Sequence, residues 1–167
     1  KKLMFVEKAY NQTLRLTELI TDMALISKME ERSEKLRKEE IDLYDVAAEV
    51  FDEFDERITE KGVIVENMLS SGTHLVANRS LVYTIIRNLV ENTLKYAGDG
   101  VTIHLECYST IDKFCYITYY DTGAGVPEDH LEEIFERFYR IDGGRARDVG
   151  GSGLGLSIVK NAVKFHG

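Results

Sequence analysis

Three asparagine- or glycine-rich segments constrain the fold of this chain most, because each one adjoins an apolar segment. Asn88-Leu-Val-Glu-Asn92 ends a helical pattern, Asp121-Thr-Gly-Ala-Gly125 follows a strand pattern, and Gly151-Ser-Gly-Leu-Gly-Leu-Ser157 opens the last helical pattern. Each segment alone is weak evidence, since glycine-rich turns are common. Their order and spacing predict that the three segments form the walls of one pocket.

Composition and charge narrow the kind of ligand. The chain has 167 residues, 44% hydrophobic and 30% charged, which suits one globular domain with room for a helical extension. Its net charge of −8 argues against a nucleic-acid surface, which requires clustered lysine and arginine. Basic residues gather instead within or beside the three segments: Lys95, Arg137, Arg140, Arg145 and Arg147. We therefore expect a local site for an anionic ligand.

Nothing in the sequence predicts a membrane span. No apolar run approaches the length that a bilayer requires, and the N-terminus has no signal-peptide pattern. The expected location is cytoplasmic, and any anchor in the inner membrane would belong to other segments of a parent protein.

Residues 1 to about 35 are predicted to form one long helix, since they contain neither proline nor glycine. Leu14, Ile20 and Leu25 widen its apolar stripe beyond a two-stranded seam, as a four-helix bundle formed by two chains requires. The alternative is a helix that packs on its own domain. The charged stretch from Glu30 to Glu40 is predicted to be a solvated connector. The stripe recurs at steps of four and three, interrupted once by Gln12: Phe5, Ala9, Leu16, Leu19, Met23 and Ile26.

The rest of the chain mixes helical patterns with hairpins. Asp42 is positioned to cap a helix that ends at Lys61-Gly62, and Asn78 to cap the next one. Cys107 and Cys115 are expected to lie on paired strands as small buried residues. The fold class is α+β, a two-layer α/β sandwich in which helices cover one face of a mixed, mainly antiparallel sheet. Strands are predicted over 63–69, 73–77, 101–108 and 114–120, and further helices over 128–135 and 154–165.

The Asn88 segment has the chemistry of a metal site. Asn88 and Asn92 are four residues apart and so share one helical face, which Lys95 and Tyr96 extend. Amide oxygens are hard donors that suit Mg²⁺, and a neutral ligand adds no repulsion toward phosphates. The alternative is a polar stripe that faces solvent.

The other two segments have the chemistry of a nucleotide site. Asp121 shares the direction of the apolar side chains of its strand, so its carboxylate requires a donor such as the exocyclic amine of adenine. Gly123 and Gly125 would let the backbone approach a flat base. Backbone N–H groups at the helix start after Gly155 can bind phosphate. A capping aspartate in an ordinary turn is the alternative for Asp121.

Together these segments resemble the catalytic and ATP-binding domain of bacterial sensor histidine kinases, in a superfamily with DNA gyrase, mismatch-repair ATPases and the heat-shock chaperone ATPase. The resemblance covers about residues 14 to 167, and Leu14 to Glu34 resembles the second helix of the dimerisation and phosphotransfer domain. Four motifs carry the rest: the N box from Asn88 to Tyr96, the G1 box from Asp121 to Gly125, the F box from Phe135 to Arg140, and the G2 box from Gly151 to Ser157.

The resemblance implies a role for each motif residue. Asn92, with Asn88 beside it, would hold Mg²⁺, Lys95 would contact phosphate, and Asp121 would accept from the adenine amine. Arg140 would reach the terminal phosphates, and the loop from Ile141 to Gly150 would be the ATP lid. Asn88, Lys95 and Arg140 are the implied catalytic residues. The remaining residues implied in ATP binding are Tyr96, Gly123, Gly125, Val126, Phe138, Gly151, Gly153, Leu154, Gly155 and Leu156.

Two departures from the family pattern shape the expected domain organisation. The phospho-accepting histidine of the family lies on the first dimerisation helix, and no histidine precedes His74 here, so the acceptor is expected upstream in the parent. The family domain also continues past His166-Gly167 with a hairpin, without which a sheet edge stays incomplete. Residues 1–38 are expected to form the dimerisation helix and connector, and residues 39–167 the ATP-binding domain.

The resemblance implies the catalytic fragment of a protein-histidine kinase. The parent would be a homodimer through its N-terminal helical region and would pass the phosphoryl group to the receiver domain of a response regulator. Hydrolytic members of the superfamily carry a glutamate where this chain has Asn88, and Glu91 lies about a hundred degrees around the helix from Asn92. Phosphoryl transfer is therefore favoured over hydrolysis. The alternatives are an inactive nucleotide-binding or dimerisation scaffold of the same fold and a serine-directed kinase.

Overall fold

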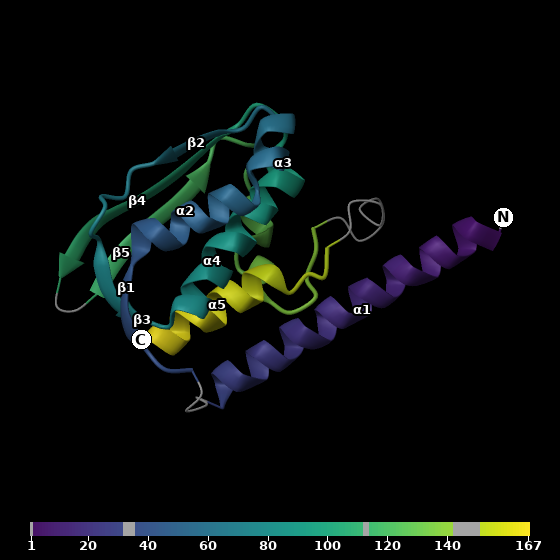
Figure 1. Cartoon of the computed structure of the whole chain (residues 1–167), viewed down its shortest axis with the longest axis horizontal. Coiled ribbons are helices and arrows are strands. Elements are labelled where there is room, and N and C mark those ends of the chain that lie inside the picture. Colours follow the sequence, from purple (N-terminus) through teal and green to yellow (C-terminus); the bar gives the residue numbers. More distant parts are fainter. Residues whose placement is uncertain (1, 32–35, 112–113, 142–150) are drawn as a thin grey trace.

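The computed structural model describes residues 2–31, 36–111, 114–141 and 151–167. Helices α2, α4 and α5 cover one face of the strands, and α1 runs past this body and projects beyond it (Figure 1). The predicted α+β class and the long N-terminal helix are confirmed. The helical elements are α1 (Lys2–Glu30), α2 (Leu43–Glu53), α3 (Asp55–Glu60), α4 (Arg79–Asn92), the π-helical η1 (Thr93–Ala97), the 3-10 turns η2 (Glu128–His130) and η3 (Glu133–Phe135), and α5 (Gly155–His166).

The described strands form two hydrogen-bonded groups. β1 (Glu39–Asp42) pairs antiparallel with β3 (His74–Ala77). β2 (Ile64–Asn67) runs parallel to β4 (Thr102–Ile111), which pairs antiparallel with β5 (Phe114–Asp121). The pairing is therefore mixed and mainly antiparallel, as predicted.

Strand β1 corrects the prediction that the chain from Glu30 to Glu40 is only a solvated connector. Glu39 and Glu40 already belong to the strand, where Glu39 pairs with Ala77 across the ladder. Both glutamates are exposed, whereas Ile41 is 5% exposed and joins the core. The charged residues concealed the strand, because its stability comes from pairing with β3 and from one buried side chain.

Helix α2 begins and ends on local signals. The side chain of Asp42 accepts the backbone N–H of Tyr44, as predicted for a cap. The single helix expected up to Lys61 is divided. Helix α2 ends at Glu53, Phe54 follows with a ψ of 4° that departs from helical geometry, and α3 begins at Asp55. Gly62 then leaves the helix with a φ of +62°, which glycine adopts without strain.

The short helix predicted over 128–135 is wrong in type, since η2 and η3 are two separate 3-10 turns. Leu131 is 47% exposed and Phe135 is 36% exposed, so little apolar packing supports a continuous α-helix here.

Two apolar clusters hold the molecule together. The main core lies between the strands and helices α2 and α4, and includes Leu43, Val50, Val90 and Ile103. The second cluster joins α1, α4 and α5 through fully or nearly fully buried side chains: Ile26, Met29, Leu81, Leu154, Ile158 and Ala162. Helix α1 is thus tied to the body by its C-terminal turns.

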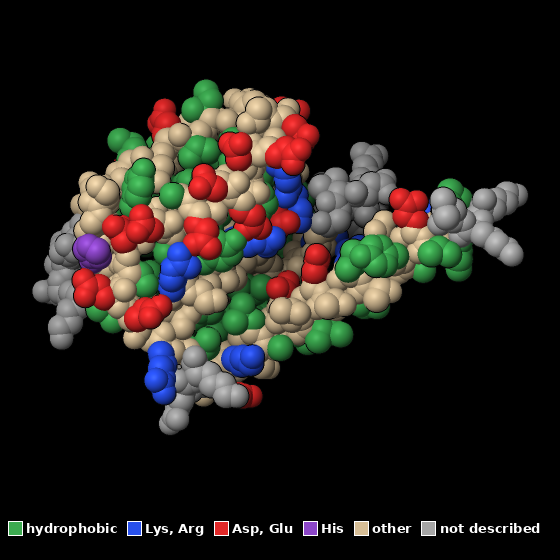
Figure 2. Space-filling view, in the orientation of Figure 1, with side chains coloured by type: hydrophobic (Ala, Val, Ile, Leu, Met, Phe, Trp, Pro, Cys, Tyr) green, Lys and Arg blue, Asp and Glu red, His purple; other side chains and the backbone are tan. Residues whose placement is uncertain are grey.

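The apolar stripe of α1 divides between two environments. Ile26 is 1% exposed against α4 and α5, whereas Phe5, Leu16 and Met23 stay exposed. Figure 2 shows hydrophobic side chains along the projecting part of the helix. The alternative of packing on its own domain is therefore correct for the C-terminal turns alone. None of the helices in the described part of the chain is long and apolar enough to cross a membrane.

The two cysteines face each other across the β4–β5 hairpin. Their Sγ atoms are 2.8 Å apart and both residues are half-buried. Burial, followed by the hydrogen bond to Cys107, raises the pKa of Cys115 to about 12. The Cys115 thiol therefore stays protonated at neutral pH, which agrees with the prediction of a small packing residue.

His166 connects the end of α5 to the start of α4. Its Nε2 accepts the backbone N–H of Asn78 at 3.0 Å, so Nδ1 carries the hydrogen that is donated to the Ala162 carbonyl at 2.6 Å. The Asn78 side chain in turn caps α4 by accepting the backbone N–H of Leu81. Burial lowers the pKa of His166, and the nearby charge of Lys38 acts in the same direction.

We expect the free energy of unfolding to decrease as the pH falls below 6.5, the ordinary pKa of histidine. The unfolded chain then binds a proton that folded His166 resists, and this loss continues until the pH reaches the lower folded-state pKa. Urea unfolding at several pH values measures the effect. His166→Gln should reduce the pH dependence, whereas His74→Gln, at an exposed histidine, should retain it. Equal pH dependence in His166→Gln and the unsubstituted chain would contradict the assignment.

Candidate functional site

The C-terminal end of α4 carries the two predicted amide ligands. Asn88 is half-buried, and its Nδ2 donates to the Thr84 carbonyl at 2.8 Å, so its Oδ1 faces away from its own helix backbone. Asn92 is the last residue of α4, and the π-helical η1 follows. Lys95 and Tyr96 lie in this π-helical turn, outside the α-helix that carries the two asparagines.

The glycine-rich loop approaches this helix end so closely that it excludes side chains. A Cβ added to Gly155 would lie 2.8 Å from the Oδ1 of Asn88. One added to Gly151 would lie 2.7 Å from the Tyr96 hydroxyl. The structure therefore brings the start of α5 beside Asn88, and the start of the loop beside Tyr96.

The Asp121 segment lies against η1. A Cβ added to Gly123 would come within 2.5 Å of the Ala97 Cβ and 2.7 Å of its carbonyl oxygen. Asp121 itself is half-buried, and its two oxygens accept from different groups. Oδ1 accepts the backbone N–H of Gly123 at 2.9 Å, and Oδ2 accepts the Thr93 hydroxyl at 2.7 Å. The carboxylate is thus held at a defined orientation beside η1.

A close backbone contact between Phe138 and Gly153 joins the F-box segment to the glycine loop. Phe138 has a φ of +65°, the only positive value at a non-glycine residue in the described part of the chain. Its N–H donates to the Gly153 carbonyl at 2.9 Å. A Cβ added to Gly153 would lie 2.9 Å from the Phe138 backbone. Strain of this kind persists only where surrounding contacts hold it, and it is common at functional sites.

The predicted cations have partners in this structure. Lys95 pairs with Glu91 at 2.9 Å, and Arg137 pairs with Glu30 of α1. Arg140 donates to the Gly151 carbonyl at 3.0 Å. Arg145, Arg147 and the predicted lid, apart from Ile141, lie outside the described residues.

The remaining predicted residues occupy different environments. Val126 is 39% exposed, and Gly125 has a φ of +69° with nothing within 4 Å of its Cβ position. Leu156 is half-buried. The Leu154 side chain is fully buried in the second cluster, and its N–H donates to the Ser152 hydroxyl at 3.2 Å. The side chain of Leu154 therefore serves packing.

Three polar residues at this place are not among those that the sequence predicts. Thr93 and Tyr119 form hydrogen bonds around Asp121, and Arg15 of α1 donates to the Gly151 carbonyl at 3.1 Å. No sequence pattern indicates these long-range contacts. The pairing of Glu91 with Lys95 was detectable, because oppositely charged residues four apart on a helix commonly pair.

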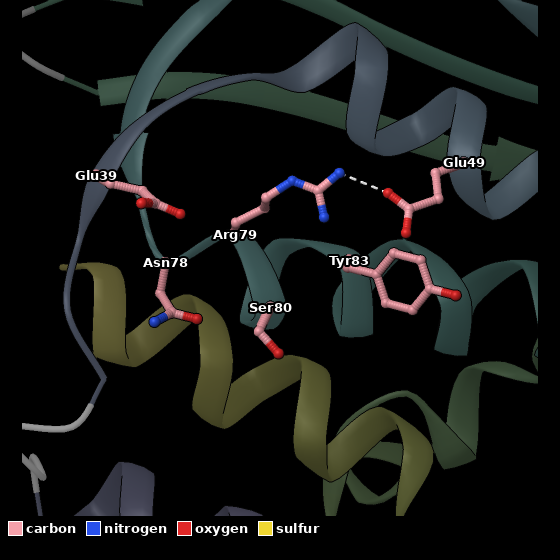
Figure 3. Close-up of a pocket in the computed structure, with 6 residues that line it drawn as sticks. All are labelled: Glu39, Glu49, Asn78, Arg79, Ser80 and Tyr83. Carbon is pink, nitrogen blue, oxygen red and sulfur yellow. Dashed lines mark hydrogen bonds and ion pairs between the residues drawn. The ribbon is translucent and has the colours of Figure 1, made fainter.

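A separate open pocket of about 410 Å³ lies near the other end of α4 (Figure 3). Arg79 extends across it from the first turn of α4 and pairs with Glu49 of α2 at 2.5 Å. None of the predicted site residues lines this pocket: its lining is Glu39, Glu49, Asn78, Arg79, Ser80 and Tyr83. Because Arg79 is already paired and glutamates surround it, this pocket is a poor candidate for an anionic ligand.

Comparison with known proteins identifies relatives of the whole chain. Residues 77–167 match the family described as histidine kinase-, DNA gyrase B- and HSP90-like ATPase. The sensor histidine kinase WalK of Bacillus subtilis is 28% identical over 98% of this chain and 27% of its own length. The sensor histidine kinase RppB of Synechocystis is 36% identical over 93% of this chain and 34% of its own length. The chain thus spans about a third of the length of these curated relatives.

A solved structure agrees with these relatives. Full-length ShkA in complex with AMPPNP superposes with a TM-score of 0.74 and 25% identity, over 95% of this chain and 34% of that chain.

Proposed function

Because the chain belongs to the family of histidine kinase-, DNA gyrase B- and HSP90-like ATPases, we propose that it is the ATP-binding catalytic part of a sensor histidine kinase. The reaction is transfer of the γ-phosphoryl group of Mg·ATP to a histidine elsewhere in the parent, for relay to an aspartate of a response regulator. The observation that carries this proposal is the approach of Gly155 to Asn88, with 2.8 Å between the Cβ position and Oδ1. It brings the start of α5 beside one of the two proposed amide ligands.

Asp121 recognises the base in this proposal. Its ionised carboxylate accepts the exocyclic amine of adenine, and guanine is excluded because it presents a carbonyl there. The backbone of Gly123 lies against Ala97, and because Gly123 has no side chain the loop can lie close to η1. Tyr96 is 52% exposed with its hydroxyl at Gly151, so its ring is available to flank the adenine.

The donor set fits a magnesium triphosphate. No cluster of three or more histidine, cysteine, aspartate and glutamate side chains that could hold a metal exists within the described ranges. Asn92 and Asn88 supply amide oxygens instead, a type of ligand that Mg²⁺ accepts together with phosphate oxygens. When bound, Mg²⁺ would neutralise part of the phosphate charge. Backbone N–H groups at the start of α5 would face the phosphates.

Lys95 and Arg140 stabilise the phosphates in this proposal. Lys95 exchanges Glu91 for a phosphate oxygen. Because the two side chains are only 22% and 24% exposed, the phosphate must replace the charge contact that Lys95 gives up. Arg140 already lies at the Gly151 carbonyl, 3.0 Å away, at the start of the phosphate loop. Positioning and charge stabilisation are the main requirements of phosphoryl transfer, since the imidazole nucleophile is already strong.

We also propose the domain division and the assembly. Residues 1–38 belong to the dimerisation region and residues 39–167 to the ATP-binding domain. The exposed apolar side chains of α1, such as Phe5 and Ile20 at 75% and 69% exposure, support a homodimer of the parent. The receiver domain of a response regulator is the proposed second partner.

Hydrolysis of ATP by the isolated chain should stay near the uncatalysed background. Glu91, the only carboxylate of the Asn88–Asn92 segment, lies 2.9 Å from Lys95 and 3.6 Å from Arg87, so it stays paired with Arg87 when Lys95 turns to a phosphate. Glu91→Gln should therefore leave phosphate release unchanged in a steady-state assay. A measurable turnover that Glu91→Gln abolishes would contradict the kinase assignment and favour a hydrolase.

Titration calorimetry with ATP and ADP, each with and without Mg²⁺, tests the proposed function. We expect Mg²⁺-dependent binding of ATP, followed by transfer of a labelled γ-phosphoryl group to a histidine on a separately supplied dimerisation helix. A chain that is folded by circular dichroism and binds neither nucleotide would instead support the scaffold alternative.

A further inference from the structure

Thr93, the first residue of η1, connects the Asn88–Asn92 segment to the Asp121 segment. Thr93 follows Asn92 directly, and its side chain is 2% exposed. Its Oγ1 lies 2.7 Å from the Oδ2 of Asp121 and 2.8 Å from the Tyr119 hydroxyl. Thr93, Tyr119 and Asp121 therefore form one continuous chain of hydrogen bonds between the end of α4 and the end of β5.

Counting hydrogens determines the direction of this chain. An ionised carboxylate can only accept, so Thr93 donates its single hydroxyl hydrogen to Asp121. The Tyr119 hydroxyl must then donate to the Thr93 oxygen. Burial, supported by the negative charge of Asp121, raises the pKa of Tyr119 above its ordinary value, so this phenol keeps its hydrogen. The donors thus run from Tyr119 through Thr93 to Asp121.

The arrangement leaves part of the carboxylate available to a ligand. Each carboxylate oxygen has two acceptor positions, and here each oxygen receives one donor from the protein. Thr93 occupies one position on Oδ2, and the Gly123 N–H occupies one on Oδ1. Two different donors therefore prevent the carboxylate from rotating, while both oxygens can still accept.

We propose that Thr93, supported by Tyr119, is a specificity-determining positioning residue that orients the Asp121 carboxylate toward the amino group of an aminopurine nucleotide. This inference rests on the proposed function. It adds that the selectivity for the 6-amino group depends on a buried hydroxyl of η1 that does not itself touch the base.

The test compares two nucleotides that differ only at the amino group. ATP carries the 6-amino group, and purine riboside triphosphate lacks it. Thr93→Val removes the hydroxyl at nearly constant volume, and we expect it to reduce the preference for ATP by about tenfold, because a hydrogen bond to a charged group is lost. Competition titration against a fluorescent nucleotide gives both dissociation constants, and their ratio is the readout.

Thr93→Ser is the matched control, because it keeps the hydroxyl and should restore the ratio of the unsubstituted chain. Tyr119→Phe removes the hydroxyl that donates to Thr93 but keeps the hydrogen bond from Thr93 to Asp121. We therefore expect the preference for ATP to fall by only about threefold. A purely structural role of Thr93 would weaken both nucleotides equally. An unchanged ratio of the two dissociation constants in Thr93→Val overturns the inference, while the proposed function stands. If Thr93→Val does not fold, an unchanged ratio in Tyr119→Phe has the same meaning. Failure of the unsubstituted chain to bind either nucleotide overturns both.

Discussion

Asp121→Asn should weaken ATP binding about a hundredfold. A hydrogen bond to a charged group contributes about 1.5–3 kcal/mol, and 1.4 kcal/mol corresponds to a factor of ten in affinity. The loss should be near the upper end of that range, because two donors already point at the carboxylate. An amide has a single acceptor oxygen, so it cannot accept from both the Thr93 hydroxyl and the Gly123 N–H, and it keeps only half of the acceptor positions of the carboxylate.

Titration calorimetry in the presence of Mg²⁺ measures this effect, and Asp99→Asn is its control. Asp99 has a side chain that is 75% exposed and pairs with Lys61 at the surface, so its replacement should leave the ATP affinity unchanged. Urea unfolding of both variants separates a loss of binding from a loss of folding. Asp121→Asn with an affinity within about threefold of the unsubstituted chain would contradict the role of Asp121 in base recognition.

Gly153→Ala should lower the free energy of unfolding by about 2–5 kcal/mol and remove ATP binding. Gly153 has a φ of +70°, where an L-residue loses about 1–2 kcal/mol. Its new Cβ would also lie 2.9 Å from the Phe138 backbone, and backbone atoms cannot move aside as a flexible side chain can. Crowding of this kind costs about 1–3 kcal/mol more.

Gly100→Ala is a matched control for that prediction. Gly100 has a φ of +69°, almost the same as that of Gly153, but nothing lies within 4 Å of its Cβ position. Its replacement should cost only the backbone strain of about 1–2 kcal/mol. The difference between the two variants in urea unfolding therefore measures the contact between Gly153 and Phe138. An equal loss of unfolding free energy in both variants would mean that the contact between Gly153 and Phe138 relaxes without cost.

Much of the local structure was predictable because its signals act over a few residues. Asp42 and Asn78 cap the helices that follow them, through hydrogen bonds to N–H groups two and three residues ahead. Alternation and turn residues located the β4–β5 hairpin, and Cys107 and Cys115 lie on its two paired strands as expected. The prediction failed where a pairing partner decides the outcome, as at β1, whose charged residues pair with β3.

The candidate site shows the same division. Asparagines four apart, an aspartate at the end of a strand and a glycine run before a helix were visible in the sequence, because each pattern occupies fewer than ten residues. The hydrogen bonds of Thr93 to Tyr119 and Asp121 span 26 and 28 residues, and no pattern in the intervening chain implies them. The π-helical turn that begins at Thr93 was equally invisible, and it meets β5 and the loop after it through Thr93 and Ala97.

The sequence by itself determined which chemical groups this protein offers: two amides, a carboxylate, several cations and a loop without side chains. It also determined the long helix and the caps, because capping and periodicity act within one turn or a few residues. Only the tertiary structure decided how these groups meet. It pairs Lys95 with Glu91, directs the Thr93 hydroxyl at Asp121 and divides the stripe of α1 between a buried end and an exposed end. These outcomes depend on packing between distant segments, whose geometry no short sequence pattern encodes.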